Sequence, residues 1–288
     1  MSLRTALRRA LTHPTDPTNP ESIDLELIEE LTPWVDRACR VWYRLGVEGL
    51  DSVPDGAALL VGNHNAGTTM LEALGAFARF YRQRPSDLCH ALAHDAIVDM
   101  PALGSLLTRI GALRAGHESA DAAFSSGRKV VVFPGGNREA FRPWRERHRV
   151  DFGGRTGFVR LALRHQVPIV PVVFHGGHDS LVILRRGERL ARWTGLRERL
   201  RTDAWPVMLA LPWGLAIGPW FHLPAPVRCT TRFLPPMPPP AGPEAADDPE
   251  VCAAWRDDVE AAMQEALTEL AQSRRARRSR AAVKDGRR

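Results

Sequence analysis

Three short apolar runs constrain the fold of this chain most strongly. Residues 57–62 (AALLVG), 129–133 (KVVVF) and 167–174 (VPIVPVVF) are each of strand length and almost free of polar side chains. Helix-length segments separate them, which is typical of a mostly parallel sheet with helices on its faces. The sequence therefore predicts an α/β fold with a mostly parallel central sheet, and residues 227–234 (VRCTTRFL) predict a late strand.

Helical periodicity is found before and after these runs. Residues 23–45 carry apolar side chains at helical spacing, which predicts an N-terminal amphipathic helix. The same spacing suits a helix on the core or one lying partly in a membrane. Residues 249–273 predict a C-terminal helix that packs on the domain after a Pro-rich linker at 235–248. We interpret residues 1–22 as a loose arm and residues 23–234 as the main domain.

The positive charge of the chain is concentrated at its C-terminal end. The formal net charge is +6, but residues 274–288 contain eight basic residues and one acid, so the rest of the chain is near −1. This composition predicts a disordered basic tail, which binds an anionic lipid surface or only aids solubility. Because the near-neutral body has no basic stripe, we expect no nucleic-acid partner.

The four cysteines lie far apart and form no C-x-x-C pair. They predict buried free thiols in a reducing compartment. His175 and His178 flank two glycines, but no third ligand stands at a suitable spacing, so we expect no metal and no cofactor.

Two later segments suggest contact with a membrane surface. Residues 181–201 interleave arginines with leucines and a tryptophan, which suits an anionic lipid surface or a solvated helix face. Residues 204–223 are apolar and rich in tryptophan but broken by prolines, so we expect them to be interfacial or buried. The N-terminus has no signal-peptide core, and no uninterrupted apolar stretch is long enough to span a bilayer. The sequence predicts a peripheral membrane protein on the cytoplasmic face.

The residues after the first apolar run offer a candidate general base. The predicted strand at 57–62 is followed by the polar segment NHNAG at 63–67. Ligands bind in open α/β sheets where such strands end, and a partly exposed histidine there titrates near neutral pH. His64 is therefore a candidate base, with a satisfied structural histidine as the alternative. A base of this kind needs an acid to orient it, and Glu72 is the nearest downstream.

A second candidate site follows the second apolar run, in the segment FPGGNRE at residues 133–139. Gly135 and Gly136 let the backbone approach a ligand closely, and Arg138 offers a fork of donors suited to phosphate. The alternative is an ordinary Pro-Gly-Gly turn.

Four sequence blocks, taken in order, resemble the glycerolipid acyltransferase superfamily, which includes the glycerol-3-phosphate and lysophosphatidic acid acyltransferases. The blocks are Asn63-His64, RIGALR at 109–114, FPGGNRE at 133–139 and VPIVPV at 167–172. The third block, with RTGFVRLAL at 155–163, is most similar to the branch that contains diacylglycerol acyltransferases and their bacterial relatives. The resemblance implies that residues 23–234 form an acyltransferase domain.

The resemblance also implies roles for individual residues. His64 corresponds to the base that deprotonates the acceptor hydroxyl for direct attack on an acyl thioester. The block with Gly135, Gly136, Arg138 and Glu139 corresponds to the part that holds the acceptor phosphate or head group. Arg114 belongs to the acceptor-side block.

One position departs from the family pattern. The usual partner of the histidine is an aspartate five residues later, where this chain has Thr69. Glu72, eight residues after His64, takes that role if residues 65–68 loop out. The alternative is that Glu72 is a plain acid in the first turn of a helix.

Together these features predict a membrane-surface O-acyltransferase of lipid metabolism and phospholipid biosynthesis. Its donor would be acyl-CoA or acyl carrier protein. Its acceptor would be a lysophospholipid, a glycerophosphate or a related lipid alcohol, on an anionic membrane surface. A serine-type lipid hydrolase is one alternative, although the chain lacks a G-x-S-x-G motif. A non-catalytic lipid-binding protein of the same fold is another.

Overall fold

The structure is a computed structural model of the chain, and it describes residues 8, 15–65, 67, 70–188, 204–218, 220 and 222–285. Its centre is a seven-stranded sheet in the order β1-β10-β6-β2-β5-β3-β4, in which β10 and β1 run opposite to the other strands. This arrangement confirms the predicted mostly parallel sheet. The strands are β1 (Gly46–Glu48), β2 (Leu59–Gly62), β3 (Cys89–Ala93), β4 (Ala112–Arg114), β5 (Lys129–Val132), β6 (Ile169–His175) and β10 (Thr230–Phe233).

The three apolar runs form β2, β5 and β6, which lie side by side in the middle of the sheet. Leu60 of β2 pairs in parallel with Val131 on one side and Val170 on the other. Helices cover both faces here, so successive side chains are apolar in both directions. The late strand predicted at 227–234 is β10.

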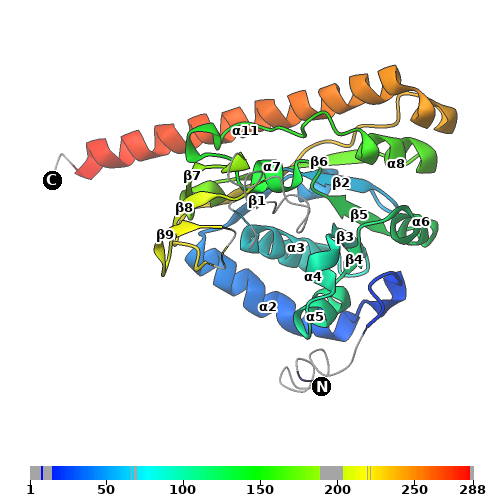
Figure 1. Cartoon of the computed structure of the whole chain (residues 1–288), viewed down its shortest axis with the longest axis horizontal. Coiled ribbons are helices and arrows are strands. Elements are labelled where there is room, and N and C mark those ends of the chain that lie inside the picture. Colours follow the sequence, from blue (N-terminus) through cyan, green and yellow to red (C-terminus); the bar gives the residue numbers. More distant parts are fainter. Residues whose placement is uncertain are drawn as a thin grey trace.

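Helices form a layer on each face of the sheet (Figure 1). On one face α3 packs against the strands and α2 packs against α3, while α6, α8 and α11 cover the other face. No helix within the described ranges is long and apolar enough to cross a bilayer. The α-helices are α2 (Leu25–Trp42), α3 (Leu71–Gln83), α4 (Asp95–Val98), α5 (Leu103–Arg109), α6 (His117–Ser125), α7 (Gly136–Ala140), α8 (Gly157–His165) and α11 (Pro249–Asp285). Short 3-10 turns are η1 (Pro20–Ser22), η2 (Leu50–Ser52), η3 (Trp144–Glu146), η4 (Gly177–Asp179) and η5 (Pro243–Asp247).

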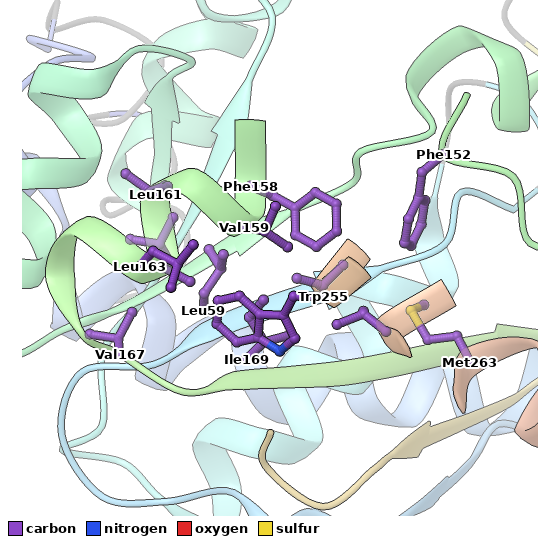
Figure 2. Packing of buried hydrophobic residues seen from close by; sticks show 14 of the residues in the cluster. Leu59, Phe152, Phe158, Val159, Leu161, Leu163, Val167, Ile169, Trp255 and Met263 are labelled. Carbon is purple, nitrogen blue, oxygen red and sulfur yellow. The ribbon is translucent and has the colours of Figure 1, made fainter. Parts of the chain in front are cut away.

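The alternation of side chains along β2 builds two separate cores. Leu59 and Val61 face α8 and α11, where they join a cluster that includes Trp255 and Met263 (Figure 2). Leu60 points to the opposite face and packs with Phe80 of α3. The sheet is therefore fixed from both sides, which makes its carboxyl edge a rigid base for the loops that follow the strands.

A second, three-stranded antiparallel sheet is formed by β7 (Val182–Arg185), β8 (Val207–Ala210) and β9 (Gly214–Ile217). Its inner face buries Ile183 and Met208 against Ala140 and Phe141, at the end of α7. The segment predicted as interfacial or buried, 204–223, supplies β8 and β9. The arginine-rich segment predicted at 181–201 begins as β7, and its residues 189–201 lie outside the described residues.

The ends of the chain differ from the predicted boundaries. The helix predicted over 249–273 is α11, and it continues to Asp285 into the segment predicted as a disordered tail. An ion pair of 2.8 Å between Arg274 and Asp179 anchors this continuation, and the alanines and arginines that follow favour helix. Figure 1 shows the last turns of α11, in red, extending past the strands.

The predicted linker at 235–248 and part of the predicted loose arm belong to the domain. Met237 pairs with Ile169 at the edge of β6, and Ala246 is buried in the core. In the arm, Glu21 forms an ion pair with Arg128. All four cysteines are free and buried, as predicted.

Candidate active site

The loops that follow β2, β5 and β6 meet at the carboxyl edge of the sheet. These three parallel strands are adjacent, so their ends bring together segments that lie far apart in the sequence. His64 follows β2, Gly135 and Gly136 follow β5, and His178 follows β6. Two of the four predicted blocks therefore meet at one edge, and the fourth block lies within β6, next to β2.

The peptide unit of His64 is held by a buried ion pair. The Glu139 carboxylate accepts hydrogen bonds from the backbone N–H groups of His64 (2.9 Å) and Asp151 (3.0 Å). Nη2 of Arg142 donates to the carbonyl oxygen of His64 at 2.9 Å and lies 3.4 Å from Glu139. Both partners are almost completely buried. Glu139 thus supports the His64 loop in the structure, and its predicted contact with substrate stays a prediction.

The backbone before His64 is equally constrained. The side chain of Asn63 pairs with the main chain of Phe174, donating to its carbonyl at 3.0 Å and accepting from its N–H at 2.8 Å. Asn63 in this way extends the pairing of β2 with β6 by one residue. A Cβ atom at Gly62 would lie 2.4 Å from the ring of Phe133, so only glycine allows that ring to lie against the strand end.

The imidazole of His64 lies against the ring of Phe133, with 5.0 Å between centroids. Its Nδ1 is buried and has no hydrogen-bond partner in the described part of the chain. Burial, together with the charges of Arg142 and Arg155, lowers the pKa of His64 from 6.5 to about 4. The ring is therefore neutral near pH 7, which is the form that can accept a proton.

Glu72 lies in the first turn of α3 and is buried, but no hydrogen bond joins it to His64. A Cβ atom at Gly177 would lie 2.7 Å from Oε1 of Glu72 and 2.7 Å from Nδ2 of Asn65, so both groups border Gly177. Burial raises the pKa of Glu72 from 4.5 to about 7. The loop that the dyad requires includes residues 66, 68 and 69, which lie outside the described residues, and the His64–Glu72 dyad stays a prediction.

Two arginines, Arg138 and Arg155, lie near the glycine turn, and the predicted contact of Arg138 with the acceptor stays a prediction. Arg138 is half exposed, and its Nε donates to Asp151 at 2.8 Å. Arg155 instead reaches the turn, where it donates to the carbonyl of Pro134 and borders Gly136. The charge of Arg155 is one of those that lower the pKa of His64.

Arg114 lies apart from this edge cluster. It ends β4, at the far side of the sheet, and forms ion pairs with Asp95 (2.8 Å) and Asp99 (2.5 Å) next to α4. Its predicted role on the acceptor side stays a prediction.

Sequence reasoning missed Arg142, Arg155 and His178 as neighbours of His64. His178 is buried with both ring nitrogens unpartnered in the described chain, and burial, together with the nearby charge of Arg142, lowers its pKa. The signal for Arg142 is its position three residues after Glu139, one helical turn on. Arg155 and His178 reach the site only through folding, so no local pattern identifies them.

Comparison with known proteins agrees with this architecture. The acyltransferase family model matches residues 44–175. An uncharacterized protein of Mycobacterium tuberculosis is 33% identical over 244 residues, covering 81% of this chain and 63% of that protein. A human protein described as a DGAT1/2-independent enzyme synthesizing storage lipids is 29% identical over 182 residues, covering 63% of this chain and 54% of that protein. The chain thus spans less than two thirds of each of these relatives.

The fold also matches a solved structure. The crystal structure of the 1-acyl-sn-glycerophosphate (LPA) acyltransferase PlsC from Thermotoga maritima superposes with a TM-score of 0.52 at 14% identity, covering 93% of this chain and 88% of that one. At this identity the likeness concerns the fold alone. The family match at residues 44–175 contains all four sequence blocks and nearly all of the His64 edge, and this part of the chain is an acyltransferase domain.

Proposed function

We propose that this protein transfers a fatty acyl chain from an acyl thioester, acyl-CoA or acyl carrier protein, to the hydroxyl of a lysophospholipid, a glycerophosphate or a related lipid alcohol. The observation that carries the proposal is His64, a neutral histidine whose peptide is clamped by Glu139 and Arg142 at the carboxyl edge of the sheet. A base must be held in place and must be unprotonated at the working pH, and the clamped peptide and the lowered pKa of His64 support this role.

In the proposed reaction the imidazole of His64 removes the proton from the acceptor hydroxyl. The oxygen attacks the thioester carbonyl, the carbon–sulfur bond breaks, and the departing thiolate takes the proton back from the imidazolium. Nε and Nη1 of Arg142 are buried without hydrogen-bond partners among the described residues. A guanidinium in this state suits the negative charge that develops on the acceptor or on the thioester oxygen.

The test is transfer activity over a matrix of acyl thioesters and acceptor lipids, for the wild-type protein and two histidine variants. His64→Ala is expected to lower the rate by roughly 10²–10⁴-fold, the usual contribution of a general base. His117→Ala is the matched control, because His117 is exposed at the start of α6. Full activity of His64→Ala with a folded protein would show that the base is elsewhere.

The pH dependence of kcat/KM gives an independent check on the base. A lowered pKa means that His64 stays neutral as the pH falls through 6.5 and becomes protonated only near its pKa of about 4. The acid limb of the profile is therefore expected well below pH 6.5. A limb at 6.5 or above would mean that an acid, such as Glu72, supports the ring in the working enzyme.

A serine hydrolase remains the alternative to be tested, because Ser180 lies in the loop after β6. Its Oγ is buried and donates to the carbonyl of Gly177 at 2.7 Å. Direct acyl transfer predicts no labelling of the protein by a fluorophosphonate probe, whereas a serine nucleophile would be labelled.

We further propose that the protein binds a membrane surface through the outer face of the β7–β8–β9 sheet. The inner face of this sheet packs on the end of α7, beside the His64 loop. The outer face and the turns next to it expose large apolar side chains, and tryptophans of this kind favour bilayer interfaces. These residues are Leu184, Leu209, Leu211, Trp213, Leu215, Ile217, Trp220 and Leu223.

Flotation with lipid vesicles tests this surface. Leu215→Asp together with Ile217→Asp is expected to abolish co-flotation, because both side chains are more than half exposed on β9. Ile97→Asp is the control, since Ile97 is an exposed apolar residue on α4 instead. Unchanged flotation of the double variant would move the membrane contact to another face.

A further inference from the structure

A cavity of about 470 Å³ lies between the central sheet and α11, and none of the residues predicted from the sequence to act in catalysis or binding lines it. It is bordered by His175 at the end of β6, Thr230 at the start of β10, and the side of α11 that carries Arg274 and Arg277. Its volume is within the usual range of about 300–1,000 Å³ for ligand sites.

The lining of this cavity is strongly basic. It includes Arg44, Arg228, Arg232, Arg274 and Arg277, and Glu48 is its single acidic residue. Two of the arginines are neutralised by the protein itself. Arg232 forms ion pairs with Glu48 (2.9 Å) and Glu269 (2.8 Å), and Arg274 forms one with Asp179 (2.8 Å).

The other three arginines, Arg44, Arg228 and Arg277, form no ion pair within the described residues. They come from three separate parts of the chain, just after α2, just before β10 and late in α11. All three residues are exposed, so water screens their mutual repulsion, but together they create a positive potential around the cavity that attracts an anion.

A buried polar atom supports the same conclusion. His175 is only 3% exposed, and its Nε2 has no hydrogen-bond partner in the described part of the chain. Its ring is stacked on His148, with 5.4 Å between centroids, so it is fixed in place. Buried side-chain nitrogens are normally satisfied, so an unpartnered one in a residue that lines the cavity is a second observation that points to a ligand.

We propose that this cavity binds a phosphate-bearing anion, with Arg228 and Arg277 as the main contacts and Arg44 at the rim. Guanidinium groups from separate elements suit the spread oxygens of phosphates better than a single carboxylate. The phosphate can belong to the head group of an anionic lipid or to a soluble molecule such as a nucleotide-bearing acyl donor. The proposal does not depend on the acyl-transfer activity.

The surroundings of Arg44 favour a lipid head group as the source of the phosphate. Arg44 follows the exposed Trp42 by two residues, and Nε1 of Trp42 donates to the carbonyl of Pro224 at 2.8 Å. Leu223, which precedes that proline, is an exposed residue of the proposed membrane surface. The cavity therefore opens next to apolar surface, as a head-group site would.

The first experiment is calorimetric titration of the full chain with pyrophosphate and with adenosine 3′,5′-bisphosphate. Saturable binding is expected, and Arg228→Glu with Arg277→Glu is expected to weaken it by at least about tenfold. Arg280→Glu is the matched control, since it makes the same charge change three residues later on α11 without lining the cavity. His64→Ala is expected to bind as the wild type does, which separates this site from the proposed chemistry.

Vesicle flotation then distinguishes the two sources. If the anion is a lipid head group, the double variant loses its preference for phosphatidylglycerol over phosphatidylcholine vesicles. If it is soluble, the preference persists and the bisphosphate binds more tightly than pyrophosphate. The proposal is overturned if neither soluble anion binds saturably and the vesicle preference is unchanged, or if Arg280→Glu weakens binding as much as the double variant. Replacing Arg228 and Arg277 by Gln gives a milder pair with the same expected direction.

Discussion

The carboxyl edge of the central sheet and the β7–β8–β9 sheet depart in opposite directions from the usual distribution of polar and apolar residues. At the edge, ionisable side chains such as Glu72, Glu139 and Arg142 are almost fully buried. On the small sheet, side chains such as Leu215 and Ile217 are more than half exposed. Buried polar groups and exposed apolar patches are the two observations that most often mark function.

The buried ionisable groups and the exposed apolar side chains differ in whether other parts of the protein contact them. Both oxygens of Glu139 have partners in the backbone, so its burial stabilises one particular loop. Oε1 of Glu72 and the ring nitrogens of His178 have none among the described residues. Leu215 and Ile217 of β9 are likewise left exposed by the described residues. Groups with internal partners stabilise the fold, and the remaining ones are those for which we propose contact with substrate or lipid.

The largest effect is expected from breaking the buried pair at the edge. Glu139→Gln leaves the Arg142 charge buried without its counter-charge, which typically costs about 3–5 kcal/mol. Urea denaturation measures the free energy of unfolding. Glu146→Gln, at an exposed acid near Arg186, is expected to change it by less than about 0.5 kcal/mol. If Glu139→Gln changed the free energy of unfolding as little as Glu146→Gln does, the buried Glu139–Arg142 pair would not stabilise the protein.

A large, pH-dependent effect is expected at Glu72. Because burial raises the pKa of Glu72 to about 7, the folded state binds a proton more tightly than the unfolded state does. Its contribution is most favourable below pH 4.5 and is lost as the pH rises through 7. Glu72→Gln removes this dependence, so the variant is expected to gain stability over wild type by on the order of 3 kcal/mol between pH 4.5 and pH 8. If the stability difference between Glu72→Gln and wild type did not change from pH 4.5 to pH 8, the pKa of Glu72 would not be raised in the folded protein.

An intermediate effect is expected at Gly177. A Cβ atom there would lie 2.7 Å from both Glu72 and Asn65, so Gly177→Ala must displace buried groups and is expected to cost about 1–3 kcal/mol. Gly157→Ala is the control, because nothing lies within 4 Å of its Cβ position at the start of α8. Thermal unfolding of both variants compares them, and a neutral Gly177→Ala would mean that the edge is loosely packed.

The smallest effect on stability is expected on the exposed sheet. Leu209→Asp is expected to change the free energy of unfolding by less than about 1 kcal/mol, since Leu209 is 46% exposed. Met208, its neighbour on β8, is buried, and Met208→Asp is expected to destabilise the protein strongly. If Leu209→Asp proved as damaging, the outer face would have a partner within the protein.

Much of the architecture could be predicted because the signals are local. The runs at 57–62, 129–133 and 167–174 are too apolar to be anything but interior strands, and they became β2, β5 and β6. Short edge strands such as β1 and β4 were not predicted, since three residues carry too little pattern. The end of α11 was placed too early, because its anchor, Asp179, lies far away in the sequence.

The candidate site likewise has features that the sequence predicts and features that depend on the fold. The sequence by itself determined that His64 follows a buried strand and that a glycine turn with arginines follows the next one. Only the tertiary structure decided that the charges of Arg142 and Arg155 act on His64, and that Glu72 borders Gly177. The physical reason is that strand and turn preferences depend on neighbouring residues, whereas charge contacts depend on which strand ends the sheet brings together.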